Sequence, residues 1–529
     1  MADKNTIPAP NPYDEVPYSS YPFAQTDPAR LRSTAYLFGM KDTPVEKARI
    51  LELGCASGNN ILSIASRYPN SECVGIDLSK AQITEGKKRI EELGIKNLKL
   101  EQISILDIKP NYGKFDYIIC HGVLSWVPDD VQEKILDICK NNLTPNGVAY
   151  ISYNTMPGWS SVKALREMML YHTSNFPGAS DKAFQARALL QFMHQGSKAL
   201  NKNFYTDLIE NELSVLSNQS DWYLLHDHLE ENNKPYYFHE FMDMAANNNL
   251  QYLADTELST MFVGNLPEET MKILNTSNDL VRSEQYMDFI TNRRFRCTIL
   301  CSAEQQLNRN LTVSHIANKY FTSRFHLPDD INDYIYAHGK TINFQAPGNL
   351  IFTTSEPEII AALTILSQQR QKPMHMDDIC KAVTELLTSK SIPVKDNLKE
   401  FLATHFLRNI FTSGIVMHMD EGLHCKFVSE KPKAFELAVY QSQKQPWITN
   451  LLHETLQIND LDRALLPLLN GKNDVNAIAK KLMPLFANNT LSMNIKEEKV
   501  TDIDVVSKNL PESIISILAR YAEVALLVK

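Results

Sequence analysis

The sequence predicts an α/β fold in which an open, mainly parallel sheet is covered by helices. Two observations lead to this fold class. Short apolar runs typical of buried strands alternate with amphipathic helical segments through the first half of the chain. The first of these runs, at 50–53, ends in a Gly-x-x-x-Gly turn that leads directly into an amphipathic helix. Together they indicate successive βαβ units.

The first five strands and their helices follow one another closely. The strands are expected at 50–54, 73–77, 98–102, 115–120 and 148–153. The helices between them are expected at about 60–68, 80–93 and 130–142. The Pro-Asn-Gly turn at 145–147 predicts the end of the last helix and the start of the fifth strand.

Two further strands, which would bring the sheet to seven, are expected late in this part of the chain. The pattern at 158–232 is helical, which predicts an insertion. Strand-like runs follow at 250–255 and 294–301, and the second is expected to be antiparallel. The catalytic core is therefore predicted to span 49–305, preceded by an N-terminal segment at 1–48.

The rest of the chain is expected to form two mainly helical domains. In the first, 306–430, helices at 370–390 and 395–410 precede a predicted hairpin between 414–419 and 423–428, which suggests a winged-helix-like module. The second is a helical domain at 431–529. Neither carries a basic helix, so packing on protein is expected rather than DNA binding.

Composition restricts the class of protein. The chain has 529 residues, of which 43% are hydrophobic and 22% charged, as in globular proteins of several domains. A net charge of −9 argues against a nucleic-acid partner. No apolar run approaches the ~18–20 residues of a membrane span. The 8 cysteines form no C-x-x-C pair, which predicts reduced thiols in a cytoplasmic protein.

The glycine turn indicates the cofactor. Gly54 and Gly58 let the backbone bend and approach a ligand closely, and Asp77 ends the next strand, where a carboxylate can accept hydrogen bonds from a ribose diol. This Glu-x-Gly-x-x-x-Gly pattern with its strand-terminal acid resembles motif I of the class I S-adenosylmethionine (SAM) methyltransferases, whose domain is Rossmann-like. It differs in spacing from the G-x-G-x-x-G of dinucleotide-binding domains. The alternative is a βα turn of another doubly wound domain.

That resemblance implies a set of residues around SAM. The turn would border the methionine moiety, Asp77 would bind the ribose, and Leu78 would lie against the adenine. Either Ser104 or Asp107 would contact the base, and Ile105 is equally compatible with a core position. The predicted cofactor-binding residues are Glu52, Gly54, Ala56, Ser57, Asn59, Asp77, Leu78, Gln82, Ser104, Ile105, Asp107 and His121.

The loops after the fourth and fifth strands are the candidate acceptor site, because parallel α/β sheets bind ligands at the carboxyl ends of their strands. The candidate catalytic residues are His121, Trp126 and Tyr153, and the candidate substrate-binding residues are Ser125, Trp126, Asn154 and Trp159. The Asn/Asp-Pro-Pro-aromatic motif of enzymes that methylate amides or amino-purines is missing after the fourth strand.

The roles of these residues stay open at this point. His121 could be a base, a hydrogen-bonding wall or a structural residue, and Trp126 could line a channel for an aliphatic amine or anchor a helix. The His226-Asp227-His228 run is not read as a metal site, because positions i and i+2 of a helix diverge.

Nearly the whole chain resembles the rickettsial-type protein-lysine methyltransferases with a methyltransferase regulatory domain. The resemblance rests on Tyr-Asp-Glu-Val-Pro-Tyr at 13–18 and Leu-Phe-Gly-Met at 37–40, on the turn at 52–59, and on the motifs at 121–128, 153–159 and 289–296. One departure is Asp27, where the family pattern leads us to expect His after Gln-Thr.

The resemblance implies methyl transfer from SAM to lysine ε-amines of an outer-membrane autotransporter, outer-membrane protein B, before its export. It also implies a homodimer formed by the helical insertion, a regulatory domain in the second half, and a tyrosine-rich N-terminal segment folded over the cofactor, which adds Tyr18 to the cofactor-binding residues. A lysine amine with a pKa of ~10.4 must lose a proton before attack, at a cost of roughly 4–5 kcal/mol at neutral pH. A channel walled by Tyr18, Trp126, Tyr153 and Trp159 would lower that pKa by desolvation.

Two other functions remain compatible with the sequence. One is a small-molecule O- or N-methyltransferase with His121 as the general base. The other is a SAM-binding regulatory protein without turnover.

Overall fold

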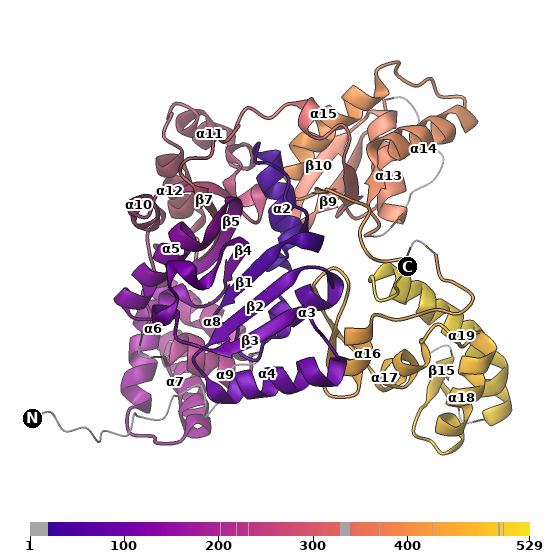
Figure 1. The fold of residues 1–529 in the computed structure, drawn as a ribbon, viewed down its shortest axis with the longest axis horizontal. Coiled ribbons are helices and arrows are strands. Elements are labelled where there is room, and N and C mark those ends of the chain that lie inside the picture. Colours follow the sequence, from indigo (N-terminus) through magenta and orange to yellow (C-terminus); the bar gives the residue numbers. More distant parts are fainter. Residues whose placement is uncertain are drawn as a thin grey trace, which may run out of the picture.

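The computed structural model describes residues 20–528, apart from 201–202, 218, 231, 328–338, 370, 426, 496–497 and 501. Tyr18, a predicted cofactor-binding residue, lies outside the described residues. Figure 1 shows a central sheet with helices on both faces and two further modules that follow it in sequence. No helix within the described ranges is both long and apolar enough to cross a membrane.

The central sheet has seven strands in the order β3-β2-β1-β4-β5-β7-β6. The first five are parallel, and β7 runs antiparallel to both β5 and β6. The α/β fold class and the antiparallel seventh strand are therefore confirmed. The strands are β1 Arg49–Leu53, β2 Glu72–Asp77, β3 Leu98–Gln102, β4 Phe115–Cys120, β5 Leu143–Asn154, β6 Leu250–Asp255 and β7 Phe295–Ser302. Strand β5 begins earlier than predicted because Leu143 pairs with Phe115 ahead of a register shift.

Alternating side chains of the strands build one hydrophobic cluster on each face of the sheet. On one face, Ile50 packs with residues of α2 and α3, and on the other, Leu51 packs with residues of α5 and α10. The helices around the sheet are α2 Pro28–Leu37, α3 Asn59–Arg67, α4 Lys80–Leu93, α5 Asp129–Asn142, α10 Phe238–Asn247, α11 Glu268–Leu274 and α12 Leu280–Thr291.

Between β5 and α10 the chain forms a separate helical layer with its own small core. Leu165, Leu190 and Ile209, from three different helices, are fully buried there. The helices are α6 Gly158–Thr173, α7 Ala179–Leu200, α8 Phe204–Ser217 and α9 Asp221–Tyr223, and a π-helical turn follows at Leu224–His228.

The segment after β7 forms a module of helices and short strands. Its elements are β8 Tyr320–Ser323, β9 Ile342–Ala346, β10 Leu350–Thr354, α13 Pro357–Gln368, β11 Met374–His375, α14 Met376–Ser389, α15 Leu398–Ile410 and β12 Ile415–His418. The predicted hairpin between 414–419 and 423–428 is wrong. Strand β12 instead pairs with the distant β8, in a sheet of order β11-β8-β12, and His424 bridges to Val528.

The last module lies beside α3 and α4 in Figure 1. Its elements are α16 Glu436–Ser442, β13 Trp447–Thr449, β14 Thr455–Gln457, α17 Asp460–Leu465, α18 Val475–Ala487, β15 Met493–Ile495, β16 Glu498–Val500 and α19 Ile503–Glu523. Strands β13 and β14 pair as an antiparallel hairpin, and the loop between them, 450–454, reaches the catalytic core.

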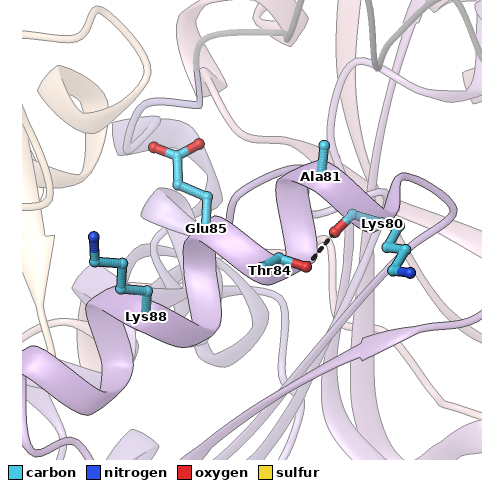
Figure 2. A pocket seen from close by; sticks show the side chains of 5 residues that line it. All are labelled: Lys80, Ala81, Thr84, Glu85 and Lys88. Carbon is cyan, nitrogen blue, oxygen red and sulfur yellow. Dashed lines mark hydrogen bonds between the residues drawn. The ribbon is translucent and has the colours of Figure 1, made fainter.

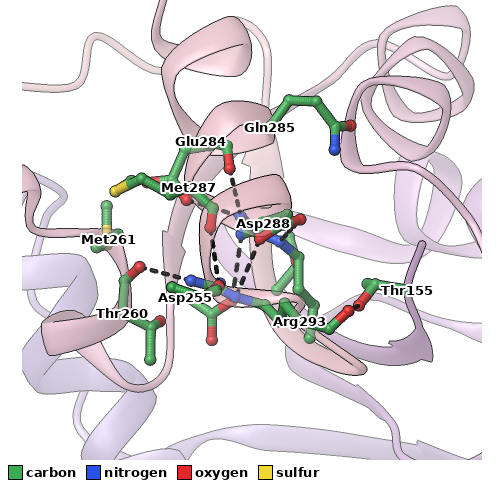
Figure 3. Close-up of polar contacts among 12 residues, drawn as sticks. Thr155, Asp255, Thr260, Met261, Glu284, Gln285, Met287, Asp288 and Arg293 are labelled. Atoms are coloured by element: carbon green, nitrogen blue, oxygen red, sulfur yellow. Dashed lines mark hydrogen bonds and ion pairs between the residues drawn. The ribbon is translucent and has the colours of Figure 1, made fainter. Parts of the chain in front are cut away.

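A buried ionic cluster ties α12 to β6 and β7 (Figure 3). Arg296 is 1% exposed, donates to the carboxylates of Asp288 and Glu284 at 2.8 Å, and lies with its guanidinium carbon 3.9 Å from the ring centre of Phe238. The neighbouring Arg293 pairs with Asp288 at 3.0 Å. The cluster therefore holds β7, the strand that lies beside β5.

Candidate functional site

The glycine turn after β1 brings the backbone close to its neighbours. Gly54 has φ +69°, and a Cβ there would lie 2.6 Å from Val123 of the loop after β4. Gly58 has φ +77°, and a Cβ would lie 2.9 Å from Leu100 on β3. Side chains at either position would both strain the backbone and clash. The turn can therefore adopt this shape only with glycine at these two positions. The same lack of side chains would let a ligand approach the backbone closely.

Asp77 lies beside this turn at the end of β2. Its Oδ2 accepts a hydrogen bond from the backbone N–H of Ala56 at 2.8 Å, and its Oδ1 accepts one from Ser79 at 2.8 Å. These contacts orient the group at the end of β2, where a carboxylate can accept hydrogen bonds from a ribose diol. Leu78, next in the chain, is 63% exposed and offers an apolar surface for a base.

Four more predicted residues lie around this edge in different environments. Gln82 is buried, and its backbone N–H is held by the Ser79 side chain at 3.2 Å. The Ser104 hydroxyl caps a short turn after β3, and Ile105 packs partly against the core. Asp107 is exposed.

Glu52 is placed differently from the other predicted cofactor-binding residues. It is 4% exposed, and its Oε1 accepts from Asn60 Nδ2 at 2.7 Å. Burial raises its pKa to about 8, and its Oε2 is buried without a hydrogen-bond partner among the described residues. Glu52 therefore stabilises the first turn of α3 through its hydrogen bond with Asn60.

Ser57 and Asn59 are both held by a residue of α4. Arg89 Nη1 donates to Ser57 Oγ at 3.1 Å and to Asn59 Oδ1 at 2.9 Å. The backbone N–H of Asn59 donates to Ser20 Oγ at 3.1 Å, so the N-terminal segment crosses the start of α3. Arg89 and Ser20 were not predicted, because neither lies in a strand-end motif.

His121 lies at the end of β4 within a polar and aromatic setting. Its Nδ1 lies 2.7 Å from Tyr150 Oη and 3.2 Å from Ser152 Oγ, and its ring centre lies 4.0 Å from that of Phe23. Burial lowers the pKa of His121 to about 4, so the ring is neutral at pH 7. Moving a proton from a lysine ammonium to such a weak base would cost roughly 9 kcal/mol. The geometry therefore favours a neutral wall over a general base.

Tyr153 does not reach this edge. It is 1% exposed, its ring centre lies 4.1 Å from that of Phe241, and its hydroxyl lies 3.1 Å from Thr298 Oγ1. Successive residues of a strand face opposite sides, so Tyr153 points into the core beneath α10, while Tyr150 and Ser152 face His121. The alternation of side chains along β5 could have identified Tyr150 and Ser152 as the residues that face His121.

The loops after β4 and β5 are joined by their predicted residues. Ser125 Oγ accepts from the backbone N–H of Asn154 at 2.9 Å. The rings of Trp126 and Trp159 meet edge to face with centroids 6.0 Å apart. His228 packs on Trp159 and hydrogen-bonds the buried Glu212 at 2.9 Å, which links this pair to the helical layer. The structure thus brings all four predicted substrate residues together.

A hollow on the outer face of α4 is separate from this edge. Figure 2 shows it lined by Lys80, Ala81, Thr84, Glu85 and Lys88, all on one helix. Glu85 and Lys88 also border a second pocket, where α4 faces α16 of the last module.

SAM fits the residues of the carboxyl edge. Gly54 and Gly58 leave room for the methionine chain. The oriented carboxylate of Asp77 suits a ribose, and the exposed side chain of Leu78 suits an adenine. When bound, SAM supplies an electrophilic methyl group on a sulfonium. The neutral His121 adds no positive charge beside that sulfonium.

Three family models match the chain. "Methyltransferase domain" matches 44–214, "Predicted methyltransferase regulatory domain" matches 220–302, and "PKMT, C-terminal winged helix domain" matches 430–526. The regulatory match lies within 49–305, the range expected for the catalytic core, and reaches only the start of the second half. The winged-helix match lies where the sequence predicted a helical domain, whereas the winged-helix-like module was expected at 306–430, where the structure has α13–α15 and the sheet β11-β8-β12.

Full-length relatives are also found. An uncharacterized protein of Rickettsia prowazekii, RP789, is 40% identical over 99% of this chain and 95% of its own length. Structures titled PKMT2 from Rickettsia typhi, one of them in complex with AdoHcy, superpose with a TM-score of 0.86 at 34% identity, over 97% of this chain and 100% of theirs. The fold, the edge geometry and these full-length matches lead to one conclusion: the chain belongs to the PKMT family of SAM-dependent protein-lysine methyltransferases.

Proposed function

We propose that this chain transfers methyl groups from SAM to lysine ε-amines of a bacterial outer-membrane surface protein of the autotransporter class. The transfer takes place in the cytoplasm, before that protein is exported. The observation that carries the proposal is the uncharged, aromatic wall of the loops after β4 and β5, where Trp126 meets Trp159 and a neutral His121 ends β4, at the edge where the glycine turn and Asp77 would hold the donor.

An amine suits this wall better than an amide or an acid. A lysine ammonium that leaves water for an aromatic surface loses solvation, which lowers its pKa and frees the lone pair that attacks carbon. Asn154 is 4% exposed, and its side chain and the Ser125 hydroxyl supply neutral polar groups on the acceptor side. The ammonium first gives one proton to solvent. The lone pair of the amine then forms the nitrogen–carbon bond as the carbon–sulfur bond breaks, and the electrons of the broken bond stay on sulfur.

The chain's own residues contribute orientation to this displacement. Tyr150 and Ser152 hold His121 in one rotamer, and the Ser125–Asn154 hydrogen bond fixes the two loops relative to each other. Holding donor and acceptor in line is the main source of rate in such a transfer.

The protein is further proposed to act as a homodimer through the helical layer α6–α8. Large apolar side chains stand exposed on these helices, among them Tyr171 at 85%, Phe184 at 68%, Phe192 at 73% and Phe204 at 78%. A second copy of the chain would bury this apolar surface. The modules after β7 are proposed to help hold the protein substrate.

A transfer assay tests the acceptor. The full chain is incubated with SAM carrying a tritiated methyl group and with a purified autotransporter passenger fragment, and the products are analysed by peptide mass spectrometry. Methyl groups on lysine are expected. A fragment whose lysines are replaced by arginine is the matched control. Label found only in added small metabolites would replace the proposal with a small-molecule methyltransferase, and AdoHcy binding without any transfer would favour a silent SAM-binding protein.

A further inference from the structure

One histidine of the last module lies buried in the catalytic core. His453, in the loop between β13 and β14, is fully buried and has φ +63°. Its Nε2 lies 2.9 Å from Asn60 Oδ1 and its Nδ1 lies 2.8 Å from Ser63 Oγ, and both partners are on α3. Residues other than glycine rarely adopt a positive φ. The loop is therefore held in the conformation that places the His453 imidazole against α3.

The hydrogen-bond pattern settles how the ring is used. Asn60 Nδ2 donates to Glu52, so Oδ1 is the amide atom that faces His453 and must accept. Nε2 therefore carries the proton, and Nδ1 accepts from the Ser63 hydroxyl. The ring is neutral, because burial, together with the positive charge of the nearby Arg67, lowers the pKa of His453 to about 3.

The same amide oxygen also holds the N-terminal segment. Asn60 Oδ1 accepts from the backbone N–H of Phe23 at 3.0 Å, and the Thr26 hydroxyl lies 3.0 Å from it and 3.2 Å from His453 Nε2. Phe23 in turn packs on His121. One chain of contacts thus runs from the last module through α3 to the wall of the candidate site.

A second contact ties the same three segments. Arg67 of α3 binds both carboxylate oxygens of Asp27, at 2.9 and 2.7 Å, and donates to the backbone oxygen of Leu451 at 3.2 Å. Asp27, which stands where the family pattern leads us to expect His, is therefore a structural anchor of the N-terminal segment in this chain.

We infer that His453 is a positioning residue for the cofactor site: through Asn60 and Thr26 it holds the segment 20–26 across the start of α3 and Phe23 against His121. The last module thereby helps to complete a site whose turn and acid, the glycine turn and Asp77, belong to the catalytic core. This inference rests on the proposed SAM site, and it is independent of the identity of the acceptor.

The test measures AdoHcy affinity by calorimetry on full-length variants. His453→Ala removes two hydrogen bonds and leaves a cavity, so the dissociation constant is expected to rise about tenfold. His453→Gln can donate to Asn60 and is expected to recover most of that loss. Tyr440→Phe is the matched control, because it removes a different contact between the last module and the core, the hydrogen bond to Glu92 at 2.5 Å, and is expected to leave the dissociation constant unchanged.

Each outcome decides the inference. If His453→Ala melts at a lower temperature but binds AdoHcy as tightly as the wild type, the histidine only stabilises the fold and the inference is wrong. If Tyr440→Phe weakens binding equally, general docking of the module is responsible instead, which also overturns it. Should His453→Ala fail to fold, Ser63→Ala takes its place, since it removes only the hydroxyl that orients Nδ1. A wild-type protein that binds AdoHcy but transfers no methyl group to lysine would count against the proposed acceptor and would leave the inference about His453 standing.

Discussion

Asp77 Oδ2 accepts the backbone N–H of Ala56 at 2.8 Å, so the acid that ends β2 directly holds the turn that follows β1. The glycine turn and the strand-terminal acid, which are 19 or more residues apart in sequence, form one structural unit. Asp77→Asn keeps the size of the side chain but removes its charge, and charged hydrogen bonds contribute about 1.5–3 kcal/mol each. AdoHcy affinity measured by calorimetry should fall at least tenfold. Asp130→Asn, an exposed acid on α5, is the control and should not change it.

The two tryptophans beside the acceptor loops should separate donor binding from transfer. Trp126→Ala removes the partner of Trp159 and opens the wall, so kcat/KM for a lysine-containing substrate should fall at least tenfold while AdoHcy affinity stays within about twofold. Trp126→Phe keeps an aromatic surface and should recover part of the rate. Equal losses of affinity and rate in Trp126→Ala would place this residue in the donor site instead.

His453 should make stability fall in acid. Its pKa is about 3 when folded and ~6.5 when unfolded, so between these values the unfolded state binds more protons and is favoured as the pH falls. From pH 7.5 to 5.0 the histidine should cost the wild type about 2 kcal/mol of unfolding free energy. His453→Gln should lack this cost, and urea denaturation of both proteins at both pH values measures the difference.

That comparison is needed because other groups titrate in the same range. His121 and His418, each with a pKa lowered to about 4 mainly by burial, add to the acid loss, whereas Glu52, with its pKa raised to about 8, opposes it. Both proteins carry all three groups. A stability gap that does not change with pH would show that His453 is protonated equally in both states.

Removing Arg296 should destabilise the fold strongly. Arg296→Met leaves the buried carboxylates of Glu284 and Asp288 without their partner, and breaking a buried ion pair in this way costs about 3–5 kcal/mol. Urea denaturation measures the loss. Lys272→Met, which removes an exposed pair with Glu268, is the control and should leave the midpoint of urea denaturation almost unchanged.

The proposed dimer should depend on the exposed aromatic residues of α7. Phe184→Ser combined with Phe192→Ser removes much of the apolar surface there and should convert the protein to a monomer in light scattering after gel filtration. Ile351→Ser is the control, because that side chain is 68% exposed but lies in the module after β7. A wild-type protein that is monomeric at high concentration would contradict the proposal.

The core was predictable because its signals are local. The apolar run at 50–53, the glycine turn and Asp77 are each decided by neighbours in sequence, and the structure places them as expected. Tyr153 lies on the opposite face of β5 from Tyr150 and Ser152, and the alternation of side chains along the strand decides that face. The hairpin at 414–428 failed because β12 finds its partner in β8, and pairing over such distances leaves no local pattern.

The same reasoning explains why His453 was missed. A histidine between two short strands has no motif, and its importance comes only from partners on α3 and in the N-terminal segment. Asp27 illustrates the opposite case: its departure from the family pattern was visible, but its pairing with Arg67 was not.

The bond between Thr26 and His453 joins residues 427 positions apart. Contacts with so large a separation close the longest loops and are late events in folding, and a chain leaving the ribosome exposes its N-terminal part first. The segment beside His121 can therefore not reach its final position until the β13–β14 loop has been synthesised. Nascent and truncated chains that stop before this loop would carry a folded sheet with an unfinished donor site, so methylation competence has to wait for that loop.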